Sequence, residues 1–261
     1  MTTEVTLNLL VFLALAGFTA GWVDAVVGGG GLIQLPALLL GFPGASPVQI
    51  LATNKLGSIC GTTTSSITYF RRVRPDLHTA LPLAAAALGG SVCGALLASR
   101  IPAAAFDPII LLVLVGVGAY TLLKPDLGSI SALRFSGRRH LSVAALVGFA
   151  IGVYDGILGP GTGSFLVFAL VGLLGYGFLQ ASAQAKIANF ATNLGALLVF
   201  IPQGAVMWQI GLLMGVCNVA GGYLGARTAV AKGSGFVRVV FVLVVGAFIV
   251  KIGYDTVAGL G

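Results

Sequence analysis

The chain has 261 residues, of which 57% are hydrophobic and only 8% are charged, and its mean hydropathy is +1.05. A soluble domain carries roughly 25% charged residues, so this composition excludes the soluble classes and predicts an integral membrane protein. The net charge of +7 does not indicate nucleic-acid binding, because the basic residues cluster between apolar runs, as the positive-inside rule describes. We therefore expect a lipid bilayer as partner and no nucleic acid.

Ten hydrophobic segments follow one another along the chain. In the first half they are predicted at residues 7–27, 32–42, 47–70, 77–99 and 105–123. In the second half they are predicted at residues 141–158, 164–175, 179–201, 208–228 and 236–256. A helix needs about 20 residues to cross the hydrocarbon core, so the two short segments, 32–42 and 164–175, are predicted to be half-helices.

The first half of the sequence recurs in the second half at a constant offset of 131 residues. The glycines and aspartate Gly17, Gly21, Asp24, Gly28 and Gly30 correspond in order to Gly148, Gly152, Asp155, Gly159 and Gly161. Self-similarity over this length indicates two structural repeats. We predict a first membrane repeat at residues 1–124 and a second at 141–261, joined by a basic cytoplasmic linker at 125–140 within one membrane domain.

Basic residues mark three connections between the segments. They are Arg71, Arg72 and Arg74; Lys124, Arg134, Arg138 and Arg139; and Arg227, Lys232 and Arg238. All three groups can be cytoplasmic only if each half crosses the membrane five times, and an odd number inverts the second half. The predicted fold is therefore all-helical, with two inverted repeats whose broken helices meet near the membrane midplane. Re-entrant hairpins are the alternative, and they would place the last group outside.

A glycine-rich break precedes each short segment. The first comprises Gly28, Gly29, Gly30 and Gly31, and the second comprises Gly159, Pro160, Gly161, Thr162 and Gly163. Irregular backbone at membrane depth must be buried in protein or line a cavity, because unpaired N–H and C=O groups in lipid cost several kcal/mol each. A half-helix that starts at such a break points its free N–H groups at it, so we predict that these residues bind an anion. Close helix packing through the spacing of Gly17 with Gly21, and of Gly148 with Gly152, is the alternative.

A lysine lies in the middle of the third segment of each half. Ser46, Pro47 and Gln49 predict the start of the first of these helices, which places Lys55 about 13 Å along the helix and near the bilayer centre. The repeat places Lys186 at the equivalent depth. Helical spacing then gives two polar stripes that we predict to bind substrate: Lys55, Ser58 and Thr62, and Lys186, Asn189 and Asn193.

Ionisable residues inside a membrane are functional by default, because a lysine there costs about 2.5–3.5 kcal/mol even on the lenient insertion scale. Asp24 and Asp155 are the acids predicted to lie within the membrane, as charge partners or as coupling residues. A structural salt bridge with either aspartate is the rival interpretation, and it does not exclude function. An anion could displace one carboxylate, or an aspartate could carry a proton.

The duplicated glycine–aspartate pattern, the buried lysine and the small-residue pairs Gly89-Gly90 and Gly221-Gly222 resemble the TauE/SafE family of sulfite and organosulfonate exporters. The resemblance covers essentially the whole chain. It implies a multi-pass transporter of the bacterial inner membrane that exports small sulfur-containing anions, such as sulfite or sulfoacetate, by alternating access coupled to protons or to the membrane potential. The second break departs from an uninterrupted glycine run, and its half-helix has no counterpart of Pro36.

Other functions remain alternatives at this point. A passive anion channel, a transporter of another small carboxylate or oxyanion, and a membrane scaffold would each fit some of the pattern. An enzyme is disfavoured, because the residues form no Ser-His-Asp set, metal-ligand spacing or nucleotide loop. We accordingly expect no catalytic residues, metal or cofactor. The anion, the coupling ion, the direction of transport and the formation of a homodimer stay open.

Overall fold

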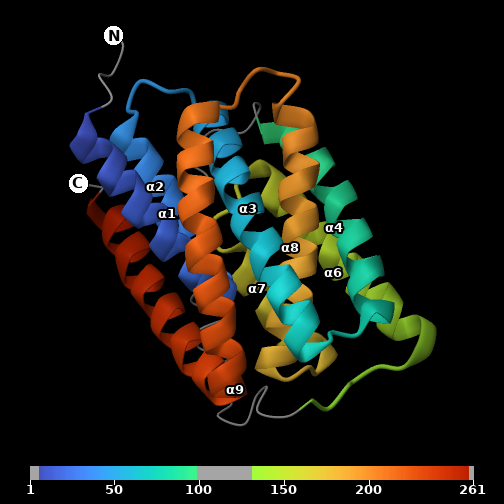
Figure 1. The fold of residues 1–261 in the computed structure, drawn as a ribbon. Helices are drawn as coiled ribbons and strands as arrows, with labels where there is room; N and C mark the ends of the chain where they lie inside the picture. The colour runs from blue at the N-terminus through green and yellow to red at the C-terminus, as the bar shows by residue number, and fades with distance from the viewer. Residues whose placement is uncertain (1–5, 99–130, 259–261) are drawn as a thin grey trace.

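The computed structural model describes residues 6–98 and 131–258, and the regular secondary structure of these residues is helical. The elements, bundled as Figure 1 shows, are α1 (Leu7–Val27), α2 (Gly31–Gly41), α3 (Pro47–Val73), α4 (Leu77–Leu97), α6 (Gly137–Ile157), α7 (Thr162–Ala169), the π-helical turn η3 (Leu170–Leu174), α8 (Phe178–Phe200) and α9 (Trp208–Ala258). The predicted segment 105–123 and residues 125–130 of the predicted linker lie outside the described residues. The last four residues of that linker already belong to α6.

Helix α9 is two helices joined at a bend. Gly233 has φ 74° and ψ −172°, which are not helical angles, and the chain reverses there. Figure 1 shows the orange part of α9 running down the bundle and the red part running back up. The bend separates the two segments that the sequence predicts at 208–228 and 236–256.

Four helices are long and apolar enough to cross a membrane. They are α1, α4, α6 and the part of α9 from Trp208 to Ala247, whereas α2 and the continuous α7–η3 segment are short apolar helices. This agrees with the predicted distinction between spanning segments and half-helices. Helices α3 and α8 have 27 and 23 residues, which is enough to cross, but they carry the polar side chains of the site.

The start of α3 follows from its first four residues. The Ser46 hydroxyl accepts a hydrogen bond from Gln49 N at 3.3 Å, and the Gln49 side chain accepts one from Ser46 N at 2.9 Å. Pro47 occupies the first helical position, where no N–H is needed. This reciprocal cap confirms the predicted start and fixes how far along α3 Lys55 lies.

Small residues let helices of the two halves approach closely. Helix α1 packs on α9, and α6 packs on α4. A Cβ at Gly17 or Gly21 would lie 2.9 or 2.5 Å from a carbonyl oxygen of α9, and one at Gly148 or Gly152 would overlap the backbone of α4. These four glycines are therefore helix-packing positions, which is the role that the sequence offered as the alternative to an anion site.

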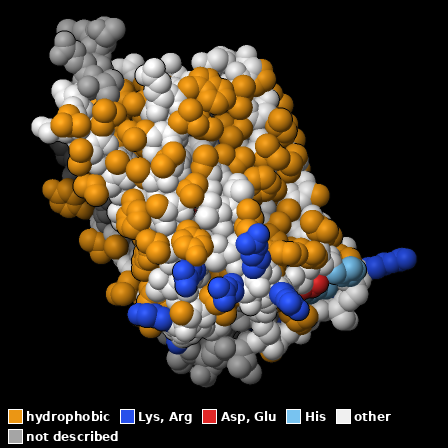
Figure 2. Space-filling model, in the orientation of Figure 1, with side chains coloured by type: hydrophobic (Ala, Val, Ile, Leu, Met, Phe, Trp, Pro, Cys, Tyr) orange, Lys and Arg blue, Asp and Glu red, His pale blue; other side chains and the backbone are white. Residues whose placement is uncertain are grey.

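The outer surface suits a bilayer with one basic side. Figure 2 shows apolar side chains over most of the visible face, with Lys and Arg gathered toward the end at which α3 finishes and α9 bends. Arg71 and Arg72 lie in the last turn of α3. Lipid-facing apolar surface with clustered basic residues at one end is the arrangement that the positive-inside rule describes.

Candidate functional site

The two glycine-rich breaks are in direct contact inside the bundle. Helix α1 ends at Gly28, whose φ of 85° is a left-handed conformation that favours glycine. Gly28 O accepts a hydrogen bond from Ser164 N at 3.0 Å, and Val27 O accepts one from the Ser164 hydroxyl at 3.0 Å. Gly28 also packs so tightly on the backbone of Gly163 that a side chain at either position would overlap the other. The end of α1 therefore meets the start of α7.

The second break is braced by side chains. The Thr162 hydroxyl donates to Gly159 O at 2.9 Å, and the Tyr154 hydroxyl donates to Pro160 O. Tyr154 also packs edge-on against Phe165. These contacts satisfy carbonyl groups that a regular helix would have paired, so the break is a defined structure instead of a loose loop.

Each buried lysine pairs with an aspartate from the other half of the chain. Lys55 Nζ on α3 lies 2.6 Å from Asp155 Oδ2 on α6, and Lys186 Nζ on α8 lies 2.9 Å from Asp24 Oδ2 on α1. The two lysine side chains are 1% and 0% exposed. The predicted ion pairs are thus present, and the structure selects the pairing that crosses between halves. A buried pair of this kind is weak evidence for stability, because desolvation offsets much of the attraction.

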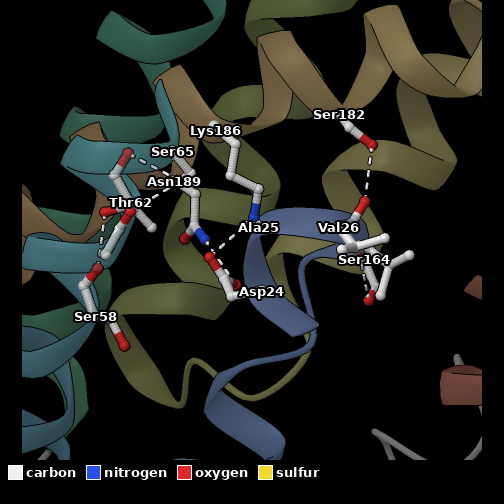
Figure 3. Close-up of polar contacts among 12 residues, drawn as sticks. Asp24, Ala25, Val26, Ser58, Thr62, Ser65, Ser164, Ser182, Lys186 and Asn189 are labelled. Carbon is white, nitrogen blue, oxygen red and sulfur yellow. Dashed lines mark hydrogen bonds and ion pairs between the residues drawn. The ribbon is translucent and has the colours of Figure 1, made fainter. Parts of the chain in front are cut away.

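The Lys186–Asp24 pair is well supplied with hydrogen bonds. Lys186 donates to Asp24 Oδ2, and Asn189 Nδ2 lies 3.5 Å from Asp24 Oδ1. Figure 3 shows both side chains reaching from α8 toward Asp24. Thr192 in turn donates to Asn189 Oδ1 at 3.3 Å. The Asp24 carboxylate is therefore held from two directions.

The Lys55–Asp155 pair has fewer partners. The two charged atoms lie 2.6 Å apart, and none of the described side chains gives Asp155 an amide contact like that of Asn189 with Asp24. Lys55 also reaches the second break, where Gly159 has φ 91° and a Cβ would lie 2.7 Å from Lys55 Nζ. This lysine is therefore placed against the irregular backbone as well as against its carboxylate.

A small polar cavity lies between the breaks and has a volume of about 10 Å³. Its lining residues are Asp24, Gly28, Gly31, Asn54, Lys55, Ser58, Asp155, Gly159, Thr162, Gly163, Asn189 and Asn193. This volume holds about one water molecule. Residues far apart in the sequence and mostly predicted to form the site are thus brought together around one enclosed space.

Some of the predicted site residues do not line this cavity. The Thr62 hydroxyl donates to Ser58 O at 2.9 Å, one turn back along α3. Lys186 is fully buried and contacts Asp24, which itself lines the cavity. Gly30 packs on α1, where a Cβ would lie 2.7 Å from Ala20 O. Gly29 and Gly161 are likewise outside the lining, so they shape the breaks without facing the cavity.

Three buried amide side chains near the cavity were missed by the sequence analysis. Gln34 Nε2 donates to Asn54 O at 3.2 Å, and Asn218 Nδ2 donates to Gln34 Oε1 at 2.7 Å. All three residues are at most 3% exposed. Their polarity within apolar segments was a usable signal. These three residues have no polar counterpart 131 residues away, whereas the predicted lysines were recognised by such a counterpart.

The cavity combines donors for an oxyanion with two carboxylates, Asp24 and Asp155. Lys55 supplies a buried positive charge, and the N-terminal ends of α2 and α7 lie at Gly31 and Thr162 in the lining. The lining also contains the amides of Asn54, Asn189 and Asn193. Charge-assisted hydrogen bonds are the strong ones, and a weakly polar surrounding strengthens them.

A second polar cluster lies at the start of α4, where Asp76 is the N-cap residue just before the candidate membrane span. Asp76 accepts hydrogen bonds from His78 N at 3.0 Å, the Thr79 hydroxyl at 2.6 Å and the Tyr176 hydroxyl at 3.3 Å. His140 Nε2 lies 3.1 Å from both hydroxyl oxygens. Partial burial raises the pKa of Asp76, but these hydrogen bonds outweigh it and hold that pKa below its ordinary value. The cluster ties α4 to α6 and to the connection between η3 and α8.

Comparison with known proteins identifies the class of protein. The profile of the family described as "Sulfite exporter TauE/SafE" matches residues 13–252. Three relatives carry names that specify no substrate. "Probable membrane transporter protein ORF9" of a Sinorhizobium species is 38% identical over 95% of this chain and 94% of its own. "Probable membrane transporter protein YfcA" of Escherichia coli K12 is 36% identical over 98% and 93%.

The third relative, a "Probable membrane transporter protein" of Haemophilus influenzae, is 34% identical over 97% of both chains. The search of solved structures finds no match. Profile, relatives and spanning helices together identify a multi-pass membrane transporter and not an enzyme, consistent with a bacterial inner membrane. The chain belongs to the TauE/SafE family of membrane transporters.

Proposed function

We propose that the protein is a secondary transporter that exports small sulfur-containing anions, sulfite or organosulfonates such as sulfoacetate, across the bacterial inner membrane. The observation that carries the proposal is the enclosed polar cavity between the two breaks, with the ammonium of Lys55 in its lining. The substrate class comes from the family description, which names sulfite. The names of the relatives specify a transporter and leave the substrate open.

The cross-half ion pairs suggest how binding couples to protons. An anion that binds Lys55 competes with Asp155 for the same ammonium. A carboxylate that loses its counter-charge in a buried site is stabilised by taking up a proton. Anion binding and protonation of Asp155 are therefore coupled in this proposal, and the membrane potential acts on whatever charge remains.

Inverted repeats would provide the symmetry that alternating access requires. Equivalent helices begin 131 residues apart: α2 and α7 at 31 and 162, α3 and α8 at 47 and 178, and α4 and α9 at 77 and 208. In Figure 1 the colour of α3 advances down the bundle and that of α8 advances up it, which supports opposite orientations of the two halves. Helix α1 packs on α9 and α6 packs on α4, so each of these contacts joins the two halves, as the two ion pairs also do.

The size of the cavity favours a carrier over an open channel. A cavity that holds about one water is too small for sulfite, which has four heavy atoms. The two breaks must therefore separate before an anion enters. Gly28 and Gly159, both with positive φ, join the half-helices to their preceding helices and are the points at which we expect that movement.

The test is flux into proteoliposomes that contain the purified protein. Sulfite, sulfate, thiosulfate, sulfoacetate, taurine and acetate are compared, with a pH gradient and a potassium diffusion potential imposed separately. We expect saturable flux of sulfite or sulfoacetate that either gradient stimulates. Protein-free liposomes give the background. Saturable flux of acetate or sulfate alone would move the substrate class to another small anion, and non-saturating flux without gradient dependence would indicate a channel.

A further inference from the structure

We propose that the two halves of the site are unequal, and that the substrate anion binds on the Lys55 side with the Asn54 amide as an additional ligand. In this proposal Lys186 and Asp24 form a charge-compensating pair that supports the site without being its anion receptor. The inference rests on the proposed function, because it specifies where the transported anion binds. The sequence repeat alone would make Lys55 and Lys186 equivalent, so the difference between them has to come from their surroundings.

The ion pairs differ in how firmly the aspartate is held. Asp24 receives a hydrogen bond from Lys186 at 2.9 Å and has the Asn189 amide 3.5 Å from its other oxygen. Asp155 Oδ2 lies 2.6 Å from Lys55 Nζ, and none of the described side chains gives Asp155 an amide contact like that of Asn189 with Asp24. An incoming anion that replaces Asp155 at its lysine therefore breaks the ion pair alone, whereas replacing Asp24 breaks the ion pair and the amide contact.

Of the two lysines, one lines the cavity. Lys55 is part of the lining, whereas Lys186 is 0% exposed and lies behind the Asp24 carboxylate. Both carboxylates, Asp24 and Asp155, line the cavity, so an anion that enters meets a carboxylate on either side and an ammonium on the Lys55 side. Attraction to an ammonium is strong in a weakly polar interior, which favours the Lys55 side for binding.

Asn54 adds a polar group that nothing in the described residues satisfies. Its side chain lines the cavity, the residue is 2% exposed, and Asn54 Oδ1 is buried without a hydrogen-bond partner. Buried amides normally have partners, and an unpaired one needs an explanation. Oδ1 is an acceptor, so its partner is a water or a protonated oxygen of the ligand, while the Nδ2 group of the same amide can donate to an oxyanion oxygen of that ligand.

A chain of hydrogen bonds fixes Asn54 in place. Gln34 on α2 donates to the Asn54 backbone oxygen, and Asn218 on α9 donates to the Gln34 side chain. The equivalent residues in the other half are Phe165, Ala185 and Ala87, which cannot form such a chain. The polar support therefore exists only on the side where Lys55 faces the cavity, and two independent asymmetries coincide.

The ligand that these groups recognise is a small oxyanion with several acceptor oxygens. The Lys55 ammonium supplies the charge, and the Asn54 amide and the Ser58 hydroxyl supply donors on the same side of the cavity. Sulfite and the sulfonate group both present three oxygens to such donors.

The decisive experiment compares two charge-neutral double variants, Lys55→Met with Asp155→Asn and Lys186→Met with Asp24→Asn. Each removes one ion pair without leaving an unpaired buried charge, and the repeat makes them matched controls. Flux of sulfite and sulfoacetate is measured in proteoliposomes. We expect the variant that lacks Lys55 and Asp155 to lose saturable flux. The variant that lacks Lys186 and Asp24 should keep saturable flux, with a raised KM.

A second measurement covers the case in which a double variant fails to fold. Asn54→Ala introduces the residue that already stands at the equivalent position 185, and it should raise KM about tenfold or more, as loss of a hydrogen bond to a charged group does. Asn218→Ala, which acts through Gln34, should raise KM by a smaller factor and leave kcat unchanged. Size-exclusion elution checks the fold of each variant.

Two results would overturn the inference. Equal losses of flux in the two double variants would show that the halves bind the anion equally. An unchanged KM for Asn54→Ala with both probes would show that Asn54 is not a ligand. In either case, saturable flux by the wild type would leave the proposed function standing. Absence of saturable wild-type flux for both probes would overturn the proposed function together with the inference.

Discussion

The two glycine-rich breaks occupy equivalent positions in the sequence and have different surroundings. At the first break Gly28 packs on the backbone of Gly163, so its contact is between main chains. At the second break Gly159 packs on the ammonium of Lys55, and Thr162 and Tyr154 brace the carbonyl groups. Both breaks line the cavity and cross at Gly28 and Gly163, and Gly159 of the second break also packs on a lysine.

The difference teaches that a repeat preserves backbone geometry more readily than chemistry. Both Gly28 and Gly159 have positive φ, 85° and 91°, because the chain must turn from a long helix into a half-helix at the same place. The side chains around each break differ between halves: Tyr154 and Thr162 correspond to Val23 and Gly31 in the first half.

The largest effect is expected at the backbone crossing. Gly28→Ala adds a methyl group that overlaps Gly163 and forces alanine into the left-handed region, which destabilises the fold by more than about 2 kcal/mol. Size-exclusion chromatography in detergent should show loss of the monodisperse peak. Gly44→Ala is the control, because a Cβ there meets no atom within 4 Å. A monodisperse Gly28→Ala protein with wild-type flux would contradict the crossing-point role.

The next effect concerns charge compensation at the second break. Asp155→Asn removes the carboxylate beside Lys55 and should lower stability by about 3 kcal/mol, because one member of a buried pair is left uncompensated. Adding Lys55→Met should restore most of the thermal stability. Unfolding of the detergent-solubilised protein, followed by tryptophan fluorescence, measures both. Equal unfolding temperatures of the single variant and the wild type would argue against a charged pair.

A smaller effect distinguishes backbone strain at the second break from displacement of the Lys55 ammonium. Gly159→Ala and Gly161→Ala both put alanine at a positive φ, 91° and 77°, but only the first new Cβ would lie near Lys55 Nζ, at 2.7 Å. We expect Gly159→Ala to raise KM for the transported anion about tenfold more than Gly161→Ala does. The two proteins should have similar unfolding temperatures. Equal values of KM would mean that Gly159 acts through strain alone.

The smallest effect tests the anchoring of the second half-helix. Tyr176, which follows η3, contacts Asp76, whereas its counterpart in the first half is Ala45. The pKa of Asp76 is lower in the folded protein than in the unfolded one, so its contribution to stability is present above the unfolded pKa, about 4, and is lost as pH falls through the folded pKa.

The stability difference between the wild type and Asp76→Asn should therefore be present at pH 7 and shrink as the pH falls below about 4. The effect is small because Asp76 is largely exposed to solvent. Unfolding temperatures of both proteins across this range provide the measurement. A difference that grew on acidification would contradict the lowered pKa.

The membrane class and the positions of the described α-helices follow from local features of the sequence. Apolar run length separates spanning helices from half-helices, and the Ser46–Gln49 cap fixes where α3 begins. The buried depth of Lys55 follows from these local features, because a helix has a fixed rise per residue. Lys186 was found through the repeat, and both lysines are buried.

Only the tertiary structure decided which groups face the cavity. The pairing of Lys55 with Asp155 and of Lys186 with Asp24 depends on how helices of the two halves cross, and hydropathy contains no information about that. Thr62 shares a helical face with Lys55 and nevertheless bonds to its own backbone. Asn54 carries no repeat signal and nevertheless lines the cavity. Local patterns set where each helix begins and ends, whereas packing between distant helices sets which side chains can meet.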